Sequence, residues 1–247
     1  MDIHPSPDVL VVTGAGSGIG RAVARQLASR SATLVLAGRR RRALEDTAAE
    51  LDPCSPPLLV DADLSTPAGA GRLAAAVGAR PVAGLALVAG GVGASSDLPG
   101  LDGVAASWEH SWRMNVLTAV LTVEALRGRL ADGAAIVALG SIAAGRGGGA
   151  YGAAKSALTP WVRDLARGLG PRGITANVVA PGYTEDTEFF GESMNPDRRS
   201  RLLSETFTGR AGQPDDVAAL VAFLLSENGR HLSGQVAHVN GGALLAG

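Results

Sequence analysis

The stretch Asp8-Val9-Leu10-Val11-Val12-Thr13-Gly14-Ala15-Gly16-Ser17-Gly18-Ile19-Gly20 decides the fold of this chain. A short apolar run leads into a glycine-rich turn, and residues 21–29 continue with apolar side chains at the spacing of one helix face. Glycines permit a tight turn and a close approach of backbone to phosphate, and the first N–H groups of the helix offer hydrogen bonds to an anion. The position of the turn, between a strand and a helix, therefore predicts a dinucleotide-binding unit.

The same alternation of apolar runs and helical stretches continues along the chain. Six more runs follow the first, at residues 32–37, 58–60, 84–88, 134–139, 175–179 and 235–239. Continuous apolar strands separated by helices are typical of a parallel sheet that is covered on both faces. We therefore predict an α/β fold, a Rossmann-type doubly wound sheet of about seven parallel strands. Neither a Pro/Ser-rich linker nor a repeat divides the sequence, so residues 1–247 are predicted to form a single domain.

Composition excludes several classes of protein. The net charge of -1 disfavours a nucleic-acid binder that works by neutralising phosphates. The apolar runs are shorter than the roughly 18 residues of a membrane span, and the N-terminus has no signal-peptide pattern. Cys54 is the only cysteine and the four histidines are scattered, so no metal site is predicted. A cytoplasmic enzyme or binding protein remains.

A single lysine stands among 22 basic residues. It is Lys155, four residues after Tyr151, which is one of two tyrosines. Positions i and i+4 share a helix face, so the phenol and the ammonium group point into the same space. A nearby cation favours phenolate and lowers the pKa of a tyrosine, which is how a tyrosine becomes a general acid or base. The alternative is a solvated helix face, and the absence of idle lysines elsewhere weighs against it.

Further motifs occur in a recognisable order. Thr13-Gly14-x-x-x-Gly18-x-Gly20 is followed by Asn115 in Met114-Asn115-Val116, by Ser141 after the fifth strand, and by Tyr151-x-x-x-Lys155. Residues 177–182 (Asn-Val-Val-Ala-Pro-Gly) and 234–242 complete the series. Over nearly the whole chain this order resembles the short-chain dehydrogenase/reductase family, and it is closest in pattern to the 3-oxoacyl-[acyl-carrier-protein] reductases.

The resemblance implies a chemical role for four residues. Tyr151 would donate a proton to a carbonyl oxygen while a hydride reaches the carbonyl carbon. Lys155 would lower the pKa of Tyr151 and bind the nicotinamide ribose. Ser141 would hold the carbonyl oxygen, and Asn115 would order a water molecule in the proton relay. Taken alone, Ser141 would pass for a turn residue and Asn115 for a polar helix contact.

The resemblance also implies a nicotinamide dinucleotide cofactor. Family members that prefer NAD usually carry an acidic residue at the end of the second strand. This chain has Gly38 there, followed by Arg39 and Arg40, and a guanidinium suits a 2′-phosphate. We therefore favour NADP(H) over NAD(H); the alternative is that residues 39–42 only solvate a helix start. The implied cofactor contacts are Gly14, Ser17, Gly18, Ile19, Gly20, Arg39, Arg40, Asp63, Leu64, Ala89, Gly90, Tyr151, Lys155, Pro181, Gly182 and Thr184.

Three segments depart from the family pattern. The fourth strand leads to Val88-Ala89-Gly90-Gly91, without the asparagine that usually ties the neighbouring backbone, so local packing there must differ. The interval from Ser141 to Tyr151 is shortened at residues 145–149, which either opens the pocket or moves Ser141. The segment after Gly182 is one residue longer than usual, so Thr184 or Thr187 holds the carboxamide, and we favour Thr184.

Residues 184–208 are predicted to form a substrate lid. Its apolar members, Phe189, Phe190, Met194 and Phe207, suggest an uncharged, partly hydrophobic carbonyl substrate, unless they form an ordinary core stripe. A carrier-bound substrate would instead need a basic entrance, for which Arg198, Arg199 and Arg201 are candidates.

The resemblance further implies a homotetramer or a homodimer. Trp161, Val162 and Leu165, together with Leu244 and Leu245, are apolar enough for subunit interfaces, although the same stripe could be core.

The sequence thus predicts an NADP(H)-dependent reductase of a small or carrier-bound ketone or 3-oxoacyl group, forming a secondary alcohol. Two alternatives stay open. One is an NAD(P)-dependent secondary alcohol dehydrogenase that works oxidatively. The other is a non-catalytic dinucleotide sensor, which would have no need of a proton donor.

Overall fold

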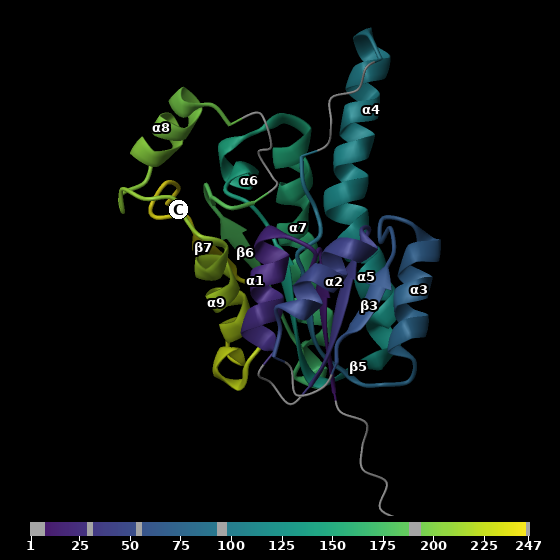
Figure 1. Cartoon of the computed structure of the whole chain (residues 1–247). Helices are drawn as coiled ribbons and strands as arrows, with labels where there is room; N and C mark the ends of the chain where they lie inside the picture. Colours follow the sequence, from purple (N-terminus) through teal and green to yellow (C-terminus); the bar gives the residue numbers. More distant parts are fainter. Residues whose placement is uncertain (1–7, 29–31, 53–55, 93–97, 188–193, 246–247) are drawn as a thin grey trace, which may run out of the picture.

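The computed structural model describes residues 8–28, 32–52, 56–92, 98–187 and 194–245. Within these ranges seven parallel strands form one sheet in the order β3-β2-β1-β4-β5-β6-β7 (Figure 1). All seven apolar runs of the sequence are strands, and the predicted fold class is confirmed. The strands are β1 Val9–Thr13, β2 Thr33–Gly38, β3 Leu58–Asp61, β4 Val82–Leu87, β5 Leu130–Leu139, β6 Thr175–Pro181 and β7 Val236–Val239.

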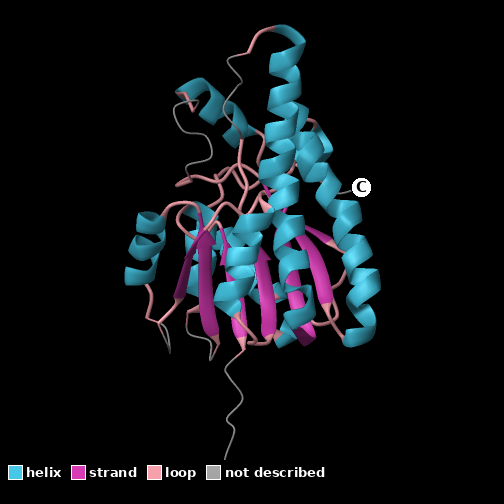
Figure 2. Cartoon of the chain, turned by 90° about the vertical axis from the view of Figure 1, so that its right-hand side faces the viewer, coloured by secondary structure: helices cyan, strands magenta, loops and turns pink. Residues whose placement is uncertain are grey.

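Helices cover both faces of the sheet, as Figures 1 and 2 show. They are α1 Gly18–Leu27, α2 Arg41–Ala49, α3 Pro67–Val77, α4 Gly100–Trp112, α5 Thr118–Leu126, α6 Ala143–Arg146, α7 Gly149–Leu169, α8 Pro196–Ser204 and α9 Pro214–Leu224. A π-helical turn, η1 Arg113–Leu117, joins α4 to α5. Helix α1 begins at Gly18, whose φ is +48°, rather than at residue 21.

Two apolar cores lie on opposite faces of the sheet. Side chains alternate across a strand, and in β1 Val9 and Val11 join one core while Leu10 and Val12 join the other. The first core packs against α3, α5 and α7. The second packs against α1, α2 and α9. Both faces of the central strands are dry, which is why those strands read as unbroken apolar runs in the sequence.

Two residues that the sequence suggested for a subunit interface belong to the core. Val162 and Leu165 on α7 are buried against the sheet, and Trp161 packs against the same core from a partly buried position. The interface prediction is therefore wrong for Val162 and Leu165. The physical reason is that an apolar stripe on a helix has the same spacing whether it faces a sheet or a partner.

The chain reverses its direction of winding between β1 and β4. Successive strands run outward from β1 to β2 and β3, and then from β4 outward to β7. The carboxyl ends of β1 and β4 therefore lie side by side with connections that leave in opposite directions. This arrangement opens a crevice above the carboxyl ends of the strands, which is where ligands bind in open α/β sheets.

The crossing of α1 over the glycine-rich turn leaves no room for a side chain. A Cβ at Gly20 would lie 2.0 Å from the carbonyl oxygen of Gly14, which itself has φ +68°. Gly71 on α3 is the opposite case, because a Cβ there would have no atom within 4 Å.

These two helical glycines predict opposite effects of one substitution. Gly20→Ala is expected to lower the free energy of unfolding by about 1–3 kcal/mol through overpacking. Gly71→Ala is expected to raise it by about 0.5–1 kcal/mol, because alanine favours a helix over glycine. Urea denaturation of both variants measures the difference. Equal effects of the two substitutions would contradict the close approach of α1 to the turn.

Candidate active site

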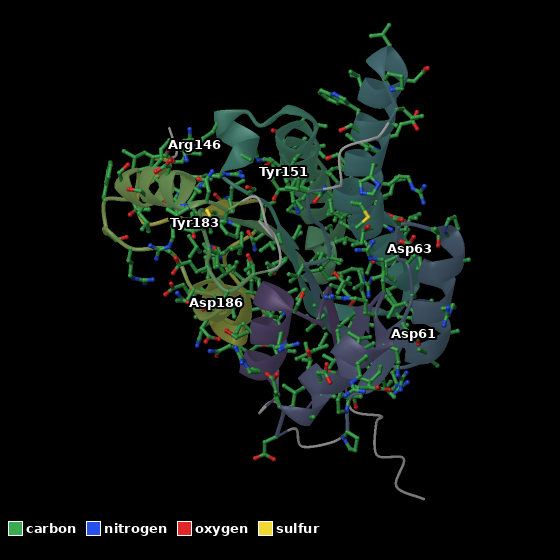
Figure 3. The ribbon with its side chains drawn as sticks, turned by 45° about the horizontal axis from the view of Figure 1, so that its top comes forward. Asp61, Asp63, Arg146, Tyr151, Tyr183 and Asp186 are labelled. Carbon is green, nitrogen blue, oxygen red and sulfur yellow. The ribbon has the colours of Figure 1, made fainter. Side chains whose placement is uncertain are left out.

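A cleft of about 1100 Å³ opens above the carboxyl ends of the strands. Figure 3 shows Arg146 and Tyr183 towards α8, Tyr151 at the start of α7, and Asp63 beside α3. Apart from Asn115 and Lys155, every site residue named from the sequence lines this cleft. Those lining residues are Gly14, Ser17, Gly18, Ile19, Gly20, Arg39, Arg40, Asp63, Leu64, Ala89, Gly90, Ser141, Tyr151, Pro181, Gly182 and Thr184.

The glycine-rich turn forms one wall of the cleft with bare backbone. A Cβ at Gly14 would stand 2.9 Å from the backbone of Ala89, so β1 and β4 approach each other closely here. Helix α1 begins at Gly18 and carries no acidic side chain in its first turn. Its free N–H groups and the positive end of its dipole suit a diphosphate. The residues present thus fit a dinucleotide.

The arginine run after β2 divides into two pairs. Arg41 pairs with Glu45 at 2.9 Å and Arg42 pairs with Asp46 at 3.2 Å, both along α2. Arg39 and Arg40 instead line the cleft. The alternative of a solvated helix start therefore describes Arg41 and Arg42. Arg39 and Arg40 lie where they can contact a ligand in the cleft.

Asp63 lines the same cleft as Arg39 and Arg40. Its carboxylate accepts hydrogen bonds from the N–H and the hydroxyl of Ser65, at 3.0 and 2.7 Å. The Ser65 hydroxyl bond holds the pKa of Asp63 below its usual value, with help from Arg113 and Arg39. The side chain is therefore ionised and oriented at neutral pH.

Ser141 and Tyr151 meet at the other end of the cleft. Burial raises the pKa of Tyr151 to about 12, and a hydrogen bond with Ser141 acts in the opposite direction. The hydroxyl oxygen of Ser141 also accepts the N–H of Ala143 at 3.1 Å, which orients it. A phenol with this pKa keeps its proton at neutral pH and is poised to donate it.

The shortened connection between Ser141 and Tyr151 does not separate them. Gly147, Gly148 and Gly149 have φ values of +84°, +144° and +59°, a backbone that other residues rarely adopt. Three consecutive residues of this kind turn the chain from α6 into α7 within a few residues. Ser141 and Tyr151 therefore line the same cleft and remain close enough to interact, and Arg146 lines this cleft as well.

Lys155 lies behind the wall of the cleft and is 3% exposed. Its ammonium group donates to the carbonyl of Leu139 at 2.7 Å and stands 5.9 Å from the centre of the Tyr151 ring. Burial lowers the pKa of Lys155 to about 8. Desolvation of the phenol, rather than Lys155, dominates the pKa of Tyr151, and the lowering of that pKa by Lys155 stays a prediction.

Asn115 performs a structural task that the sequence did not reveal. It lies in the π-helical turn, where its amide donates to the carbonyl of Gly91 at 2.8 Å and its oxygen accepts the N–H of Gly91 at 3.0 Å. Thr13 holds the neighbouring Ala89, whose N–H donates to the threonine hydroxyl at 3.0 Å. These bonds tie down the segment after β4, which lacks the asparagine common in related sequences.

Asn115 and Lys155 converge on Gly90 from behind. A Cβ at Gly90 would lie 2.7 Å from the side-chain oxygen of Asn115 and 3.1 Å from Nζ of Lys155. The two side chains thus abut a single glycine of the cleft wall. The side chain of Asn115 forms hydrogen bonds with the backbone in this structure. Its part in a proton relay stays a prediction.

The segment after β6 closes the cleft on one side. Thr184 is buried, and its hydroxyl donates to the carbonyl of Gly182 at 3.3 Å. Thr187 also lines the cleft and faces Gly18, where a Cβ would be 3.3 Å from its methyl group. The choice between Thr184 and Thr187 as the carboxamide contact thus stays a prediction.

The predicted lid contains α8, and its charges are already partly paired. Arg199 forms an ion pair with Glu185 at 2.6 Å, so it is not an open entrance charge, whereas Arg198 and Leu202 line the cleft. Phe207 is 78% exposed and is not among the lining residues. Met194 is half-buried, and Phe189 and Phe190 lie outside the described residues.

Sequence reasoning missed Thr13, Arg146, Leu202 and Glu205 as residues of the site. An arginine placed among glycines between Ser141 and Tyr151 was the available signal for Arg146. Leu202 and Glu205 carried none, because α8 reaches the cleft only through tertiary packing. In the parts of the chain that the structure describes, no cluster of three acidic, His or Cys side chains could hold a metal. No described helix combines the length and apolarity of a membrane span.

Comparison with known proteins places these features in a family. The model described as enoyl-(acyl carrier protein) reductase matches residues 14–243. An uncharacterized oxidoreductase of Methylorubrum extorquens is 32% identical over 242 residues, which cover 95% of this chain and 96% of that protein. The 3-oxoacyl-[acyl-carrier-protein] reductase FabG of Escherichia coli is 40% identical, but over 110 residues, 43% of this chain and 44% of FabG.

A solved structure extends the likeness to three dimensions. A short-chain dehydrogenase from Burkholderia cenocepacia, crystallised in complex with NADP, is similar with a TM-score of 0.84. The two chains are 30% identical, and the match covers 98% of this chain and 99% of that one.

The buried ammonium predicts a pH dependence of stability. Folded Lys155 releases its proton near pH 8, whereas the unfolded chain holds it up to the ordinary pKa of 10.5. Between these values the unfolded state binds more protons, so the free energy of unfolding rises with pH. In Lys155→Met this contribution is absent.

The free energy of unfolding of wild type minus that of Lys155→Met is thus expected to be constant below pH 8. It should then rise towards pH 10.5, by about 1.4 kcal/mol per unit of pKa difference. Chemical denaturation across this range measures it. A difference that does not change with pH would show that the ammonium is not desolvated.

Proposed function

This chain belongs to the short-chain dehydrogenase/reductase family of oxidoreductases, which use a nicotinamide dinucleotide, and on that premise we propose that it reduces a ketone to a secondary alcohol with NADP(H). The observation that carries the proposal is the meeting of the Ser141 and Tyr151 hydroxyls at one end of a cleft. The other end of that cleft offers a helix N-terminus and two arginines.

The side chains divide the chemistry among themselves. The bound cofactor supplies hydride. Tyr151 donates its proton to the carbonyl oxygen, and Ser141 donates a hydrogen bond to the same oxygen and stabilises the developing negative charge. Lys155 supplies positive charge behind the ring of Tyr151 and is held in place by Leu139. Asn115 holds the backbone of Gly91, in the wall of the cleft, through a hydrogen bond.

The protonation state of Tyr151 suits the role of proton donor in a ketone reduction. A pKa of about 12 leaves the phenol as a proton donor at neutral pH. An alcohol dehydrogenase working oxidatively needs the phenolate as a base, so this second candidate would require a large shift on cofactor binding. A non-catalytic sensor would have no use for a hydroxyl pair at the end of the cleft.

The substrate is a carbonyl compound, either a small ketone or a 3-oxoacyl group on a carrier. The likeness to FabG supports the second, but it covers less than half of each chain. Val92, Met114, Ile142 and Leu202 line the cleft and supply apolar contacts for either. The enzyme is proposed to act in the cytoplasm.

A homotetramer or homodimer is part of the proposal. Helix α4 projects beyond the sheet (Figures 1 and 2). Leu101, Val104, Trp108 and Trp112 recur along it at helical spacing, and each is about half exposed or more. A stripe of this kind favours a partner surface, and it replaces the α7 residues that the sequence suggested.

Replacing the proton donor tests the chemistry. Tyr151→Phe is expected to lower kcat for ketone reduction by about 100-fold or more, since it removes the general acid. Binding of NADPH, followed by fluorescence titration, should change little. Tyr183→Phe makes the same chemical change at the other tyrosine and should reduce kcat far less. Ketone turnover at the wild-type rate in Tyr151→Phe would overturn the catalytic assignment.

Cofactor preference can be tested on the arginine run. The double change Arg39→Ala and Arg40→Ala is expected to weaken NADPH binding relative to NADH by about 10- to 100-fold, by removing charge-assisted hydrogen bonds. Arg42→Ala is the matched control, because this arginine pairs with Asp46. Dissociation constants of both dinucleotides provide the readout. An unchanged ratio in the double variant would mean that the run only solvates α2.

A further inference from the structure

Arg146 lines the cleft, but the proposed ketone reduction gives its positive charge no role. It is the last residue of α6, the short helix between Ser141 and Tyr151, and its side chain lines the cleft. In Figure 3 it lies at the same end of the molecule as Tyr151 and towards α8. A substrate whose carbonyl reaches Ser141 and Tyr151 therefore has its remaining groups close to a guanidinium.

The partner of Arg146 is a carboxylate from the lid segment. Nη2 of Arg146 lies 2.7 Å from Glu205, and the two side chains are 30% and 31% exposed. Glu205 is the C-cap residue of α8, at the end of the helix where the dipole disfavours negative charge. Arg146 thus offsets an unfavourable placement of Glu205, and the pair joins two walls of the cleft.

An ion pair of this exposure is easily exchanged. Half-exposed salt bridges contribute little net free energy, because both ions are well solvated when apart. An incoming carboxylate or phosphate can form the same charge-assisted, forked hydrogen bonds with the guanidinium. Glu205 can then turn to solvent at small cost.

The rest of this end of the cleft fits an anion that is attached to an apolar stem. Arg198, on the same helix as Leu202, lines the cleft as well. Leu202 and Ile142 add apolar surface to the lining of the same cleft. The guanidinium of Arg146 is complementary to an acid group.

We propose that Arg146 is a specificity-determining residue that binds an anionic group of the substrate, a carboxylate or a phosphate, in exchange for Glu205. The inference rests on the proposed ketone reduction and names its substrate class, a ketone that also carries a carboxylate or a phosphate. It replaces the uncharged substrate that the apolar lid residues suggested.

Two variants separate this role from a merely structural one. Both Arg146→Met and Glu205→Gln break the ion pair, so a latch between α6 and α8 would make them behave alike. An anion site makes them opposite: Arg146→Met removes the receptor, and Glu205→Gln removes its competitor. Arg127→Met is the control, because Arg127 pairs with Glu124, three residues earlier in the chain, and is not among the residues lining the cleft.

The ligands are 3-oxohexanoate, its methyl ester, and the 3-oxohexanoyl thioester of phosphopantetheine, each titrated calorimetrically with NADPH present. Arg146→Met should weaken binding of an anionic ligand by about tenfold or more, as for a lost charge-assisted hydrogen bond. Glu205→Gln should tighten it several-fold, and the ester should bind all variants alike. The oxo acid and the phosphopantetheine thioester distinguish a carboxylate from a phosphate as the bound group.

Equal effects of both variants on acid and ester, or an acid bound no better than its ester by wild type, would overturn the inference. The kinetics answer a separate question. If the acid binds as expected but is not reduced, the anion site stands and the proposed ketone reduction fails. If the ester is reduced while Arg146→Met leaves acid binding unchanged, the reduction stands and the anion site fails.

Discussion

The hydrogen bond from the ammonium of Lys155 to the carbonyl of Leu139 holds the candidate active site together. Leu139 ends β5, the strand that leads to Ser141, and Lys155 lies one helical turn after Tyr151 on α7. A buried cation without a partner would be strongly unfavourable. The bond therefore fixes α7 against the end of β5 and, with it, the phenol against the serine hydroxyl. A guanidinium would be too large and too forked for this place, which explains why the single lysine of the chain is found here.

Several local features accompany the contact between α7 and the end of β5. The connection from Ser141 to Tyr151 is short, and three glycines with positive φ make the turn that a longer loop would otherwise make. The segment after β4 lacks its usual asparagine, and Thr13 and Asn115 hold it through the backbone of Ala89 and Gly91. Gly90 gives both Asn115 and Lys155 room to approach the wall. Two of the three departures from the family pattern are thus accompanied by local contacts or backbone turns that keep the cleft wall in place.

Ion pairs determine which of the arginines around the cleft are directed away from it. At the dinucleotide end, Arg41 and Arg42 are occupied along α2, which leaves Arg39 and Arg40 at the cleft. At the substrate end, Glu185 occupies Arg199, while Arg146 and Arg198 face the cleft with Glu205. The cleft is thus lined by arginines at both ends, which suits a dinucleotide at one end and, in our proposal, an acidic ketone at the other.

The sequence by itself determined the sheet, because seven apolar runs and a glycine-rich turn carry their meaning in local spacing alone. It also determined the family and the placement of most cleft residues, since these follow strand ends directly. Only the tertiary structure decided what depends on burial and on distant neighbours. Val162 and Leu165 became core rather than interface, and burial raised the pKa of Tyr151. Glu205 met Arg146 across 59 residues of chain. Desolvation and contacts between remote segments have no signature in spacing, and for that reason the chemistry of this site had to be read from the folded chain.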